Sequence, residues 1–204
     1  MKFTLSILAL LAIAFLVGCS AKDTSSNNKL SNSEITKLGK KYGGVYVFNK
    51  KFEKEIDDRE RERKEAIKEL KGRDLGGGLY AVDTKPVDQK FPQTLSNGKK
   101  YYTTTRAYGE DYNKQAKLPK IYKEKIINFI GQEDYNKFKP SMLLSYFYVD
   151  DNKNIIPIVV SVYYTIGYTK YGLFGDEGRG FSLSRRDIKD VGGDSVFYME
   201  DLEK

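Results

Sequence analysis

The sequence predicts an α+β fold, a single domain in which an antiparallel sheet carries a few helices on one face. Two β-rich runs flank residues 150–154, which all favour turns, and this pattern indicates a long β-hairpin. Two segments of helical character, residues 51–71 and 118–130, precede the hairpin and supply the helices. Shorter β-forming runs complete the expected sheet.

A short strand is expected at residues 45–48, followed by a helix at residues 51–71 with eight basic and eight acidic residues and no glycine or proline. Opposite charges stand four residues apart at Glu55 and Arg59, Asp57 and Arg61, and Glu60 and Lys64. Apolar residues are sparse and lie toward the two ends. We therefore expect an exposed helix that covers one face of the sheet and touches the core at its ends.

Residues 74–78, DLGGG, predict the end of that helix and a turn, because the patterns GxGxxG and GK[ST] of phosphate-binding loops are missing. A strand at residues 79–82 and a proline-containing loop follow. The Asn97-Gly98 pair favours a tight turn that leads into a β-forming run at residues 99–111.

The second helix, residues 118–130, has one apolar stripe at helical spacing and should bury that face. The stripe consists of Leu118, Ile121, Tyr122, Ile126, Phe129 and Ile130. Gly131 predicts its end, and a short second helical turn through Tyr135 and Phe138 is expected after it.

The second strand of the hairpin begins near Pro157 and has the two-residue period of a half-buried strand. One face is predicted to consist of Ile158, Val160, Val162, Tyr164 and Ile166. A loop is expected at residues 172–180, followed by short strands at residues 181–183 and 196–199.

The first 18 residues have the pattern of a secretory signal peptide, since Lys2 is followed by an uncharged run that ends at Gly18. The run is shorter than the roughly 20 apolar residues of a transmembrane helix. Leu16, Val17, Gly18 and Cys19 then resemble the lipobox of bacterial lipoproteins. The resemblance implies that Cys19 is acylated, as with palmitate, and that the chain is cut before it.

The resemblance also implies a cell-envelope protein whose membrane partner is reached through the acylated Cys19. Ser20 resembles the residue that directs lipoproteins to the outer membrane of a Gram-negative cell. Residues 19–34 are polar and rich in Ser and Asn, which predicts a flexible tether, and residues 35–204 form the expected α+β domain.

The chain has no histidine, which excludes Ser-His-Asp and Cys-His catalysis and the ordinary zinc and haem sites. We expect no cofactor and no metal, and no catalytic residue is assigned. Pairs of adjacent carboxylates such as Asp150-Asp151 do not predict a hydrolase, because neighbours on a strand or turn point apart. Carboxylates brought together from distant segments would leave that activity open.

The strongest candidate for a binding surface interleaves basic and aromatic residues: Lys99, Lys100, Tyr101, Tyr102 and Arg106. Residues 85–139 contain twelve basic and six acidic residues, which indicates a local positive patch. Such a patch would suit anionic lipid, an acidic glycan or an acidic protein. In the alternative interpretation, the lysines occupy the solvent face of a strand and the tyrosines point inward.

These observations favour a lipid-anchored envelope protein that binds another envelope or exported protein, as an accessory or as an inhibitor of the immunity type. One alternative is a module that binds envelope glycan or anionic lipid through the Lys/Tyr run. Another is a carboxylate-dependent hydrolase. Nucleic acid is not an expected partner, because the export signal places the domain in the envelope.

Replacement of Cys19 by alanine is expected to leave an uncleaved precursor without lipid, because the thiol is the acylated nucleophile. Labelling with a radioactive fatty acid and mass spectrometry of the amino terminus measure both steps. A variant that is still cut after Gly18 and still acylated would contradict the assignment.

Overall fold

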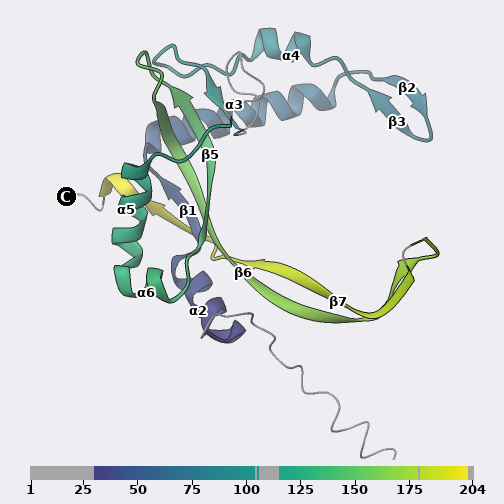
Figure 1. The fold of residues 1–204 in the computed structure, drawn as a ribbon. Helices are drawn as coiled ribbons and strands as arrows, with labels where there is room; N and C mark the ends of the chain where they lie inside the picture. Colours follow the sequence, from purple (N-terminus) through teal and green to yellow (C-terminus); the bar gives the residue numbers. More distant parts are fainter. Residues whose placement is uncertain (1–29, 104, 106–114, 179, 202–204) are drawn as a thin grey trace, which may run out of the picture.

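The computed structural model describes residues 30–103, 105, 115–178 and 180–201, with only the backbone of Asp176. The predicted signal peptide, Cys19 and Arg106 lie outside the described residues. The predicted α+β class is confirmed (Figure 1). The helices are α2 (Asn32–Tyr42), α3 (Lys50–Lys68), α4 (Lys85–Lys90), α5 (Lys120–Ile130) and α6 (Gln132–Lys137). The strands are β1 (Gly44–Val47), β2 (Arg73–Gly76), β3 (Leu79–Ala81), β4 (Tyr101–Tyr102), β5 (Ser141–Val149), β6 (Ile155–Asp176), β7 (Gly180–Val191) and β8 (Ser195–Tyr198).

The main sheet has the order β4-β5-β6-β1-β8, and β7 pairs with the outer part of β6. All its strand pairs are antiparallel except β1 and β8, which are parallel. The predicted β5–β6 hairpin is confirmed, with a turn in which the Asn154 backbone N–H donates to Asp150 Oδ1 at 2.7 Å. The predicted inward face is confirmed for Val160, Val162 and Tyr164, which are buried in one cluster. It is wrong for Ile158, which is buried with Val159 in the cluster on the other face, because the register shifts between Tyr146 and Phe147.

The predicted loop at residues 172–180 is wrong, because β6 continues to Asp176 and pairs with β7 over most of that length. The predicted short strand at residues 181–183 is the beginning of the twelve-residue β7. Gly172 and Leu173 do not end the strand: they occupy a β-bulge between Tyr171 and Phe174, which absorbs the irregular sequence without breaking the pairing.

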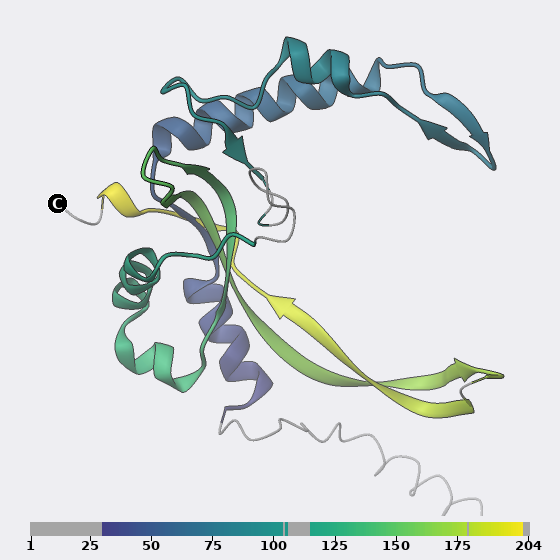
Figure 2. The same ribbon diagram turned by 45° about the horizontal axis from the view of Figure 1, so that its top comes forward.

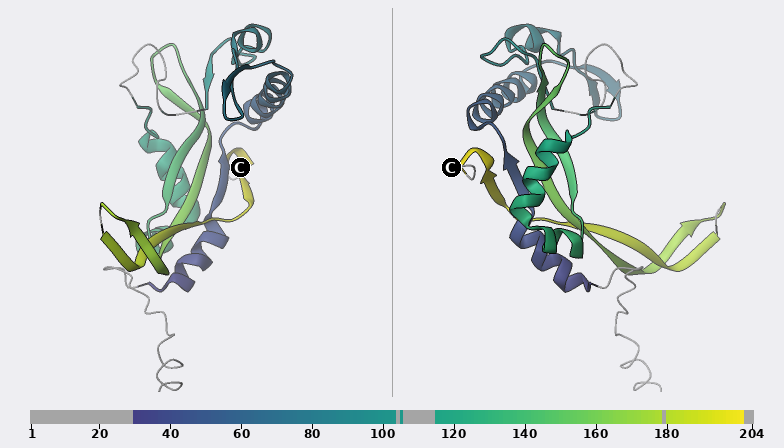
Figure 3. Two further views of the ribbon diagram at one scale, coloured as in Figure 1. Left: turned by 90° about the vertical axis from the view of Figure 1, so that its right-hand side faces the viewer. Right: turned by 60° about the vertical axis from the view of Figure 1, so that its left-hand side comes forward.

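Two hydrophobic clusters form on opposite faces of the sheet. Helices α2, α5 and α6 cover one face, where Tyr46, Val160 and Val162 are buried. Helix α3 packs against the other face, where Ile56 belongs to the same cluster as Val47, so the helices lie on both faces of the sheet and not on one face as expected. Because Tyr46 and Val47 are neighbours on β1, their side chains point to opposite faces. Figure 3 shows the sheet edge-on between α5 and α3.

Helix α2 begins at Asn32, so the folded part starts before the predicted boundary at residue 35. Ser31 is its N-cap and forms a capping box with Glu34: Glu34 N–H donates to Ser31 Oγ at 3.3 Å, and Ser31 N–H donates to Glu34 Oε2 at 2.8 Å. The spacing S-x-x-E of this capping box lies within residues 19–34, the segment expected to be a tether.

Helix α3 is exposed along much of its length, and the predicted core contact near its start is found, where Phe52 and Ile56 join the cluster of Val47. Ile56 is fully buried there, and the side chain of Arg63 is nearly so. The ion pairs also differ from those predicted: Arg59 pairs with Glu62 and Arg61 with Asp58, three residues apart. Arg59 also donates to the Pro92 carbonyl at 3.2 Å, a contact outside the helix.

The turn predicted at residues 74–78 is confirmed only for Gly77 and Gly78, because residues 74–76 belong to β2, which forms a separate two-stranded hairpin with β3. The loop expected after it contains the short helix α4. This hairpin and the outer part of β6–β7 project from the same side of the molecule (Figures 1 and 2). The described helices are all too short or too polar to span a lipid bilayer.

The predicted apolar stripe of α5 buries Ile126 and Ile130 but leaves Ile121 61% exposed. Gly131 ends the helix with φ +86°, a conformation that favours glycine.

Replacing Ile126 by alanine should lower the free energy of unfolding by about 2–5 kcal/mol, because it opens a cavity in the core. Ile121→Ala, in the same helix, should change it by less than about 0.5 kcal/mol. Urea unfolding measures both, and equal losses would contradict the assigned orientation of α5.

Candidate functional site

Tyr101 of the predicted patch lies in the core. Its ring is 1% exposed, and its hydroxyl donates to Glu60 Oε1 on α3 at 2.6 Å. Burial, with the Glu60 carboxylate, raises the pKa of Tyr101 well above its usual value. For this residue the alternative interpretation, with tyrosine pointing inward, is confirmed.

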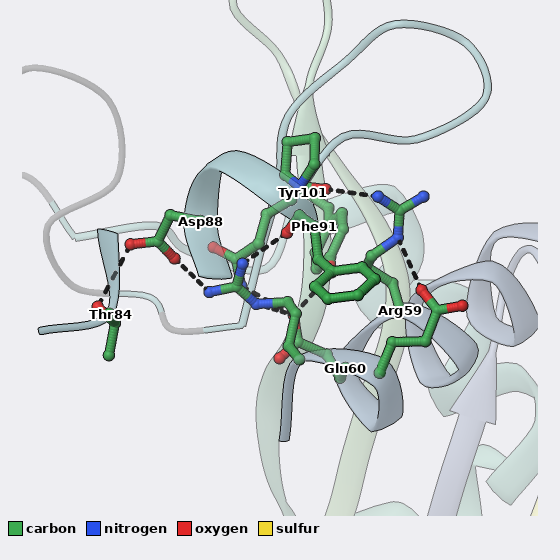
Figure 4. Close-up of polar contacts among 10 residues, drawn as sticks. Arg59, Glu60, Thr84, Asp88, Phe91 and Tyr101 are labelled. Atoms are coloured by element: carbon green, nitrogen blue, oxygen red, sulfur yellow. Dashed lines mark hydrogen bonds and ion pairs between the residues drawn. The ribbon is translucent and has the colours of Figure 1, made fainter. Parts of the chain in front are cut away.

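Glu60 belongs to a polar network that joins α3 to α4 and the following loop (Figure 4). Arg63 Nη2 lies 2.6 Å from Asp88 Oδ1, and Arg63 Nη1 donates to the Phe91 carbonyl at 2.6 Å. The Arg63 guanidinium lowers the pKa of Asp88. Because the arginine charge is matched by Asp88 and Glu60, this cluster serves to hold the two helices together.

Lys99 and Lys100 of the predicted patch each contact a different group of this chain. Lys99 forms an ion pair with Asp151 in the β5–β6 turn. Lys100 Nζ lies 5.4 Å from the ring centroid of Tyr102, and that ring stacks on Phe147 with centroids 5.3 Å apart. The structure therefore brings Lys99 and Lys100 to the surface beside partners of this chain, and it shows no aromatic platform formed with Tyr101.

An acidic cavity of about 390 Å³ lies between α3 and the sheet. Glu53 and Asp57 stand one turn apart on the helix and face the same strand residues. It is lined by Val45, Glu53, Asp57, Ser145, Tyr146, Val159, Ser161 and Val196. Across the cavity, the hydroxyls of Ser145 and Ser161 lie 2.8 Å apart.

Burial and the charge of Asp57 raise the pKa of Glu53, and burial together with Asp57 raises the pKa of Tyr146. Both carboxylates come from one helix, so they do not face each other across the cavity as those of a glycosidase must. This geometry suits a cationic group better than hydrolysis. Over the part of the chain that the structure describes, no three Asp or Glu side chains gather as a metal site requires.

Asp134 and Asp150, each a member of a pair of adjacent carboxylates in the sequence, have hydrogen-bond partners within this chain. Asp134 accepts a hydrogen bond from the Tyr42 hydroxyl at 2.7 Å and one from Lys137 at 3.0 Å, which lowers its pKa. Asp150 accepts from Asn154 in the hairpin turn, as expected for turn chemistry. These pairs stabilise the fold locally.

The outer part of the β6–β7 hairpin, residues 166–176 and 180–189, is named the arm. Its large apolar side chains are unusually exposed: Tyr168 42%, Tyr171 74%, Leu173 71%, Phe181 61%, Leu183 77% and Ile188 74%. The β2–β3 hairpin has the same character at Leu75, Leu79 and Tyr80. In the sequence, the alternation of apolar and polar residues at 181–184 (FSLS) indicates a strand at this position of the arm.

The arm exposes apolar groups on both of its faces. Directly paired residues share a face, so Tyr168 lies with Asp187 on one face and Tyr171 with Ser184 on the other. These side chains are exposed to solvent in the part of the chain that the structure describes, so they contribute little to folding. A group of large exposed apolar side chains on one projecting element is typical of an interaction site.

Comparison with protein-family models, with curated proteins and with solved structures finds no match for this chain.

The raised pKa of Glu53 predicts a pH-dependent effect of Glu53→Gln. A raised folded-state pKa stabilises the protein below the ordinary value of 4.5, and this contribution is lost as the pH rises through the raised value. Relative to the parent, the Gln variant should therefore gain stability between pH 4 and pH 7, by less than about 1 kcal/mol. Glu65→Gln, at an exposed position of α3, is the control. Urea unfolding at several pH values tests this, and a difference independent of pH would contradict it.

Proposed function

We propose that this chain is a lipid-anchored envelope protein that acts by binding another envelope or exported protein, as an accessory or an inhibitor of the immunity type. The observation that carries the proposal is the arm, whose apolar side chains lie on both faces of a projecting ribbon. Burying such side chains against a partner supplies the dominant favourable term of protein association. The proposed lipid at Cys19 would hold the arm near partners in the same envelope.

The shape of the arm favours a protein over a bilayer as its partner. A two-stranded ribbon has two edges with unpaired backbone groups, which hydrocarbon cannot satisfy. A protein surface can satisfy them and cover the apolar faces at the same time. The acidic cavity adds a place for a lysine or arginine side chain of that partner.

The module that binds glycan or anionic lipid has less support, because Tyr101 is buried and Lys99 is paired with Asp151. The hydrolase has less support as well, because Glu53 and Asp57 lie on the same wall of their cavity. Both alternatives remain outcomes of the experiment that follows.

The tagged full-length chain, expressed in its own envelope and solubilised in detergent, should retain one stoichiometric protein that mass spectrometry identifies. Leu173→Gln and Leu183→Gln remove apolar surface from the arm. Each variant should bind that protein at least about tenfold more weakly, which corresponds to a loss of about 1.4 kcal/mol of binding free energy. Ile121→Gln changes a comparably exposed residue of α5 and should retain it.

Retention of only glycan or lipid would replace the proposal by the envelope-binding module. If nothing is retained, protein binding is contradicted, and a substrate screen for the hydrolase follows. Equal retention by the arm variants and by Ile121→Gln would contradict the arm as the binding surface.

A further inference from the structure

Strand β7 has an open edge. It pairs with β6 on one side, and among the described residues no strand pairs with its other side. Residues 180–190 are exposed except for the half-buried Asp187. Edge strands of this length normally attract a further strand unless something blocks them.

The sequence of this edge is self-complementary. Residues 186–190 read Arg-Asp-Ile-Lys-Asp, and in the reverse direction Asp-Lys-Ile-Asp-Arg. When the segment is aligned antiparallel with a copy of itself about Ile188, Asp187 stands opposite Lys189, and Arg186 opposite Asp190. Both pairings occur twice because of the two-fold symmetry. Directly opposed opposite charges stabilise an antiparallel pair, and like charges destabilise it.

Ile188 lies at the centre of this alignment and lacks a cover within its own hairpin. Its cross-strand neighbour on β6 is Gly167, which has no side chain to pack against it. The isoleucine is consequently 74% exposed although it stands near the base of the arm. A second Ile188 directly opposite would cover it, since the Cα atoms of opposed residues lie about 4.5–5.5 Å apart.

We propose that a second copy of this chain pairs antiparallel with the open edge of β7, with Ile188 opposite Ile188 at a two-fold axis. The pairing makes one sheet continuous through both copies and forms an isologous interface. Asp187 already accepts two hydrogen bonds from Arg185, at 2.7 and 2.9 Å. Its carboxylate oxygens have further lone pairs for Lys189 of the second copy. The inference rests on the open edge and its charges, so it does not depend on the proposed function.

Alternation of charge on an edge also serves to repel unwanted strands. The order of the charges favours pairing over repulsion here. Because the charges on either side of Ile188 are opposite in sign, one antiparallel register brings all of them into attractive pairs. A shift of the alignment by one position, with Ile188 opposite Asp187, places Arg185 opposite Asp190 but Arg186 opposite Lys189, so that each attraction is offset by a repulsion.

A disulfide tests the register. In the full-length chain, Ile188→Cys places two thiols opposite each other at the axis, within the 4.4–6.8 Å Cα separation of a disulfide. Mild oxidation should link most of the protein into a dimer on non-reducing gels. Ser184→Cys is the matched control, since the same alignment separates the two thiols by eight residues, or about 26 Å. The parent chain, whose one cysteine is Cys19, measures background linkage.

A charge exchange tests the chemistry. Asp187→Lys and Lys189→Asp each place like charges opposite each other twice, and each variant should self-associate at least about tenfold more weakly than the parent. Mixing the two variants restores every opposite pair, so differently tagged copies should capture each other. This recovery also shows that both variants are folded.

Linkage of Ile188→Cys no greater than that of Ser184→Cys would overturn the proposal. So would undiminished self-association of either charge variant, or a mixture in which the two variants fail to capture each other. Light scattering of the purified chains gives the mass of each species independently of the tags.

Discussion

The arrangement of the domain depends on a single constraint, which is that one long strand pairs with three others. The inner part of β6 pairs with β5 on one side and β1 on the other, and its outer part pairs with β7. Because side chains of a strand alternate, the inner part buries Val160 and Val162 against α2, α5 and α6 and Val159 against the α3 side. The outer part leaves the core, and there the same alternation exposes apolar residues instead.

Helix α3 shows how a highly charged segment is fixed to such a sheet. Ile56 supplies the apolar contact, while Glu60 and Arg63 reach polar groups of distant segments, namely the Tyr101 hydroxyl and the Phe91 carbonyl. Charge-assisted hydrogen bonds of this kind are stronger than those between neutral groups, and a buried guanidinium without its carboxylates would be costly. The network therefore fixes the position of α3, and with it the wall of the acidic cavity that carries Glu53 and Asp57.

The surfaces available for binding are those where apolar side chains or backbone hydrogen-bonding groups have no partner among the described residues of this chain. The lysines of the predicted patch have partners within the chain, whereas the arm has apolar side chains on both faces and an open edge on β7. Apolar burial and strand pairing are both means of protein recognition. They act at different places here, with the exposed leucines toward the tip of the arm and the self-complementary charges near its base.

The sequence by itself determined the elements whose information is local. The hairpin turn at residues 150–154, the alternation of Val160, Val162 and Tyr164, and the stop of α5 at Gly131 were all predictable, because periodicity and turn chemistry depend on neighbours along the chain. The proposed lipid site at Cys19 likewise rests on a contiguous motif. The class α+β followed from the sum of these elements.

Only the tertiary structure decided what depends on distant segments. Tyr101 is a core residue because it packs with Ile56 and Ile158, and Glu60, 41 positions away, accepts its hydrogen bond. Residues 172–176 became strand because β7 pairs with them, although their glycines favour a loop. The acidic cavity and the open edge of β7 also arise from how segments meet. Local patterns cannot predict them, since packing and pairing across the chain override the preferences of single residues.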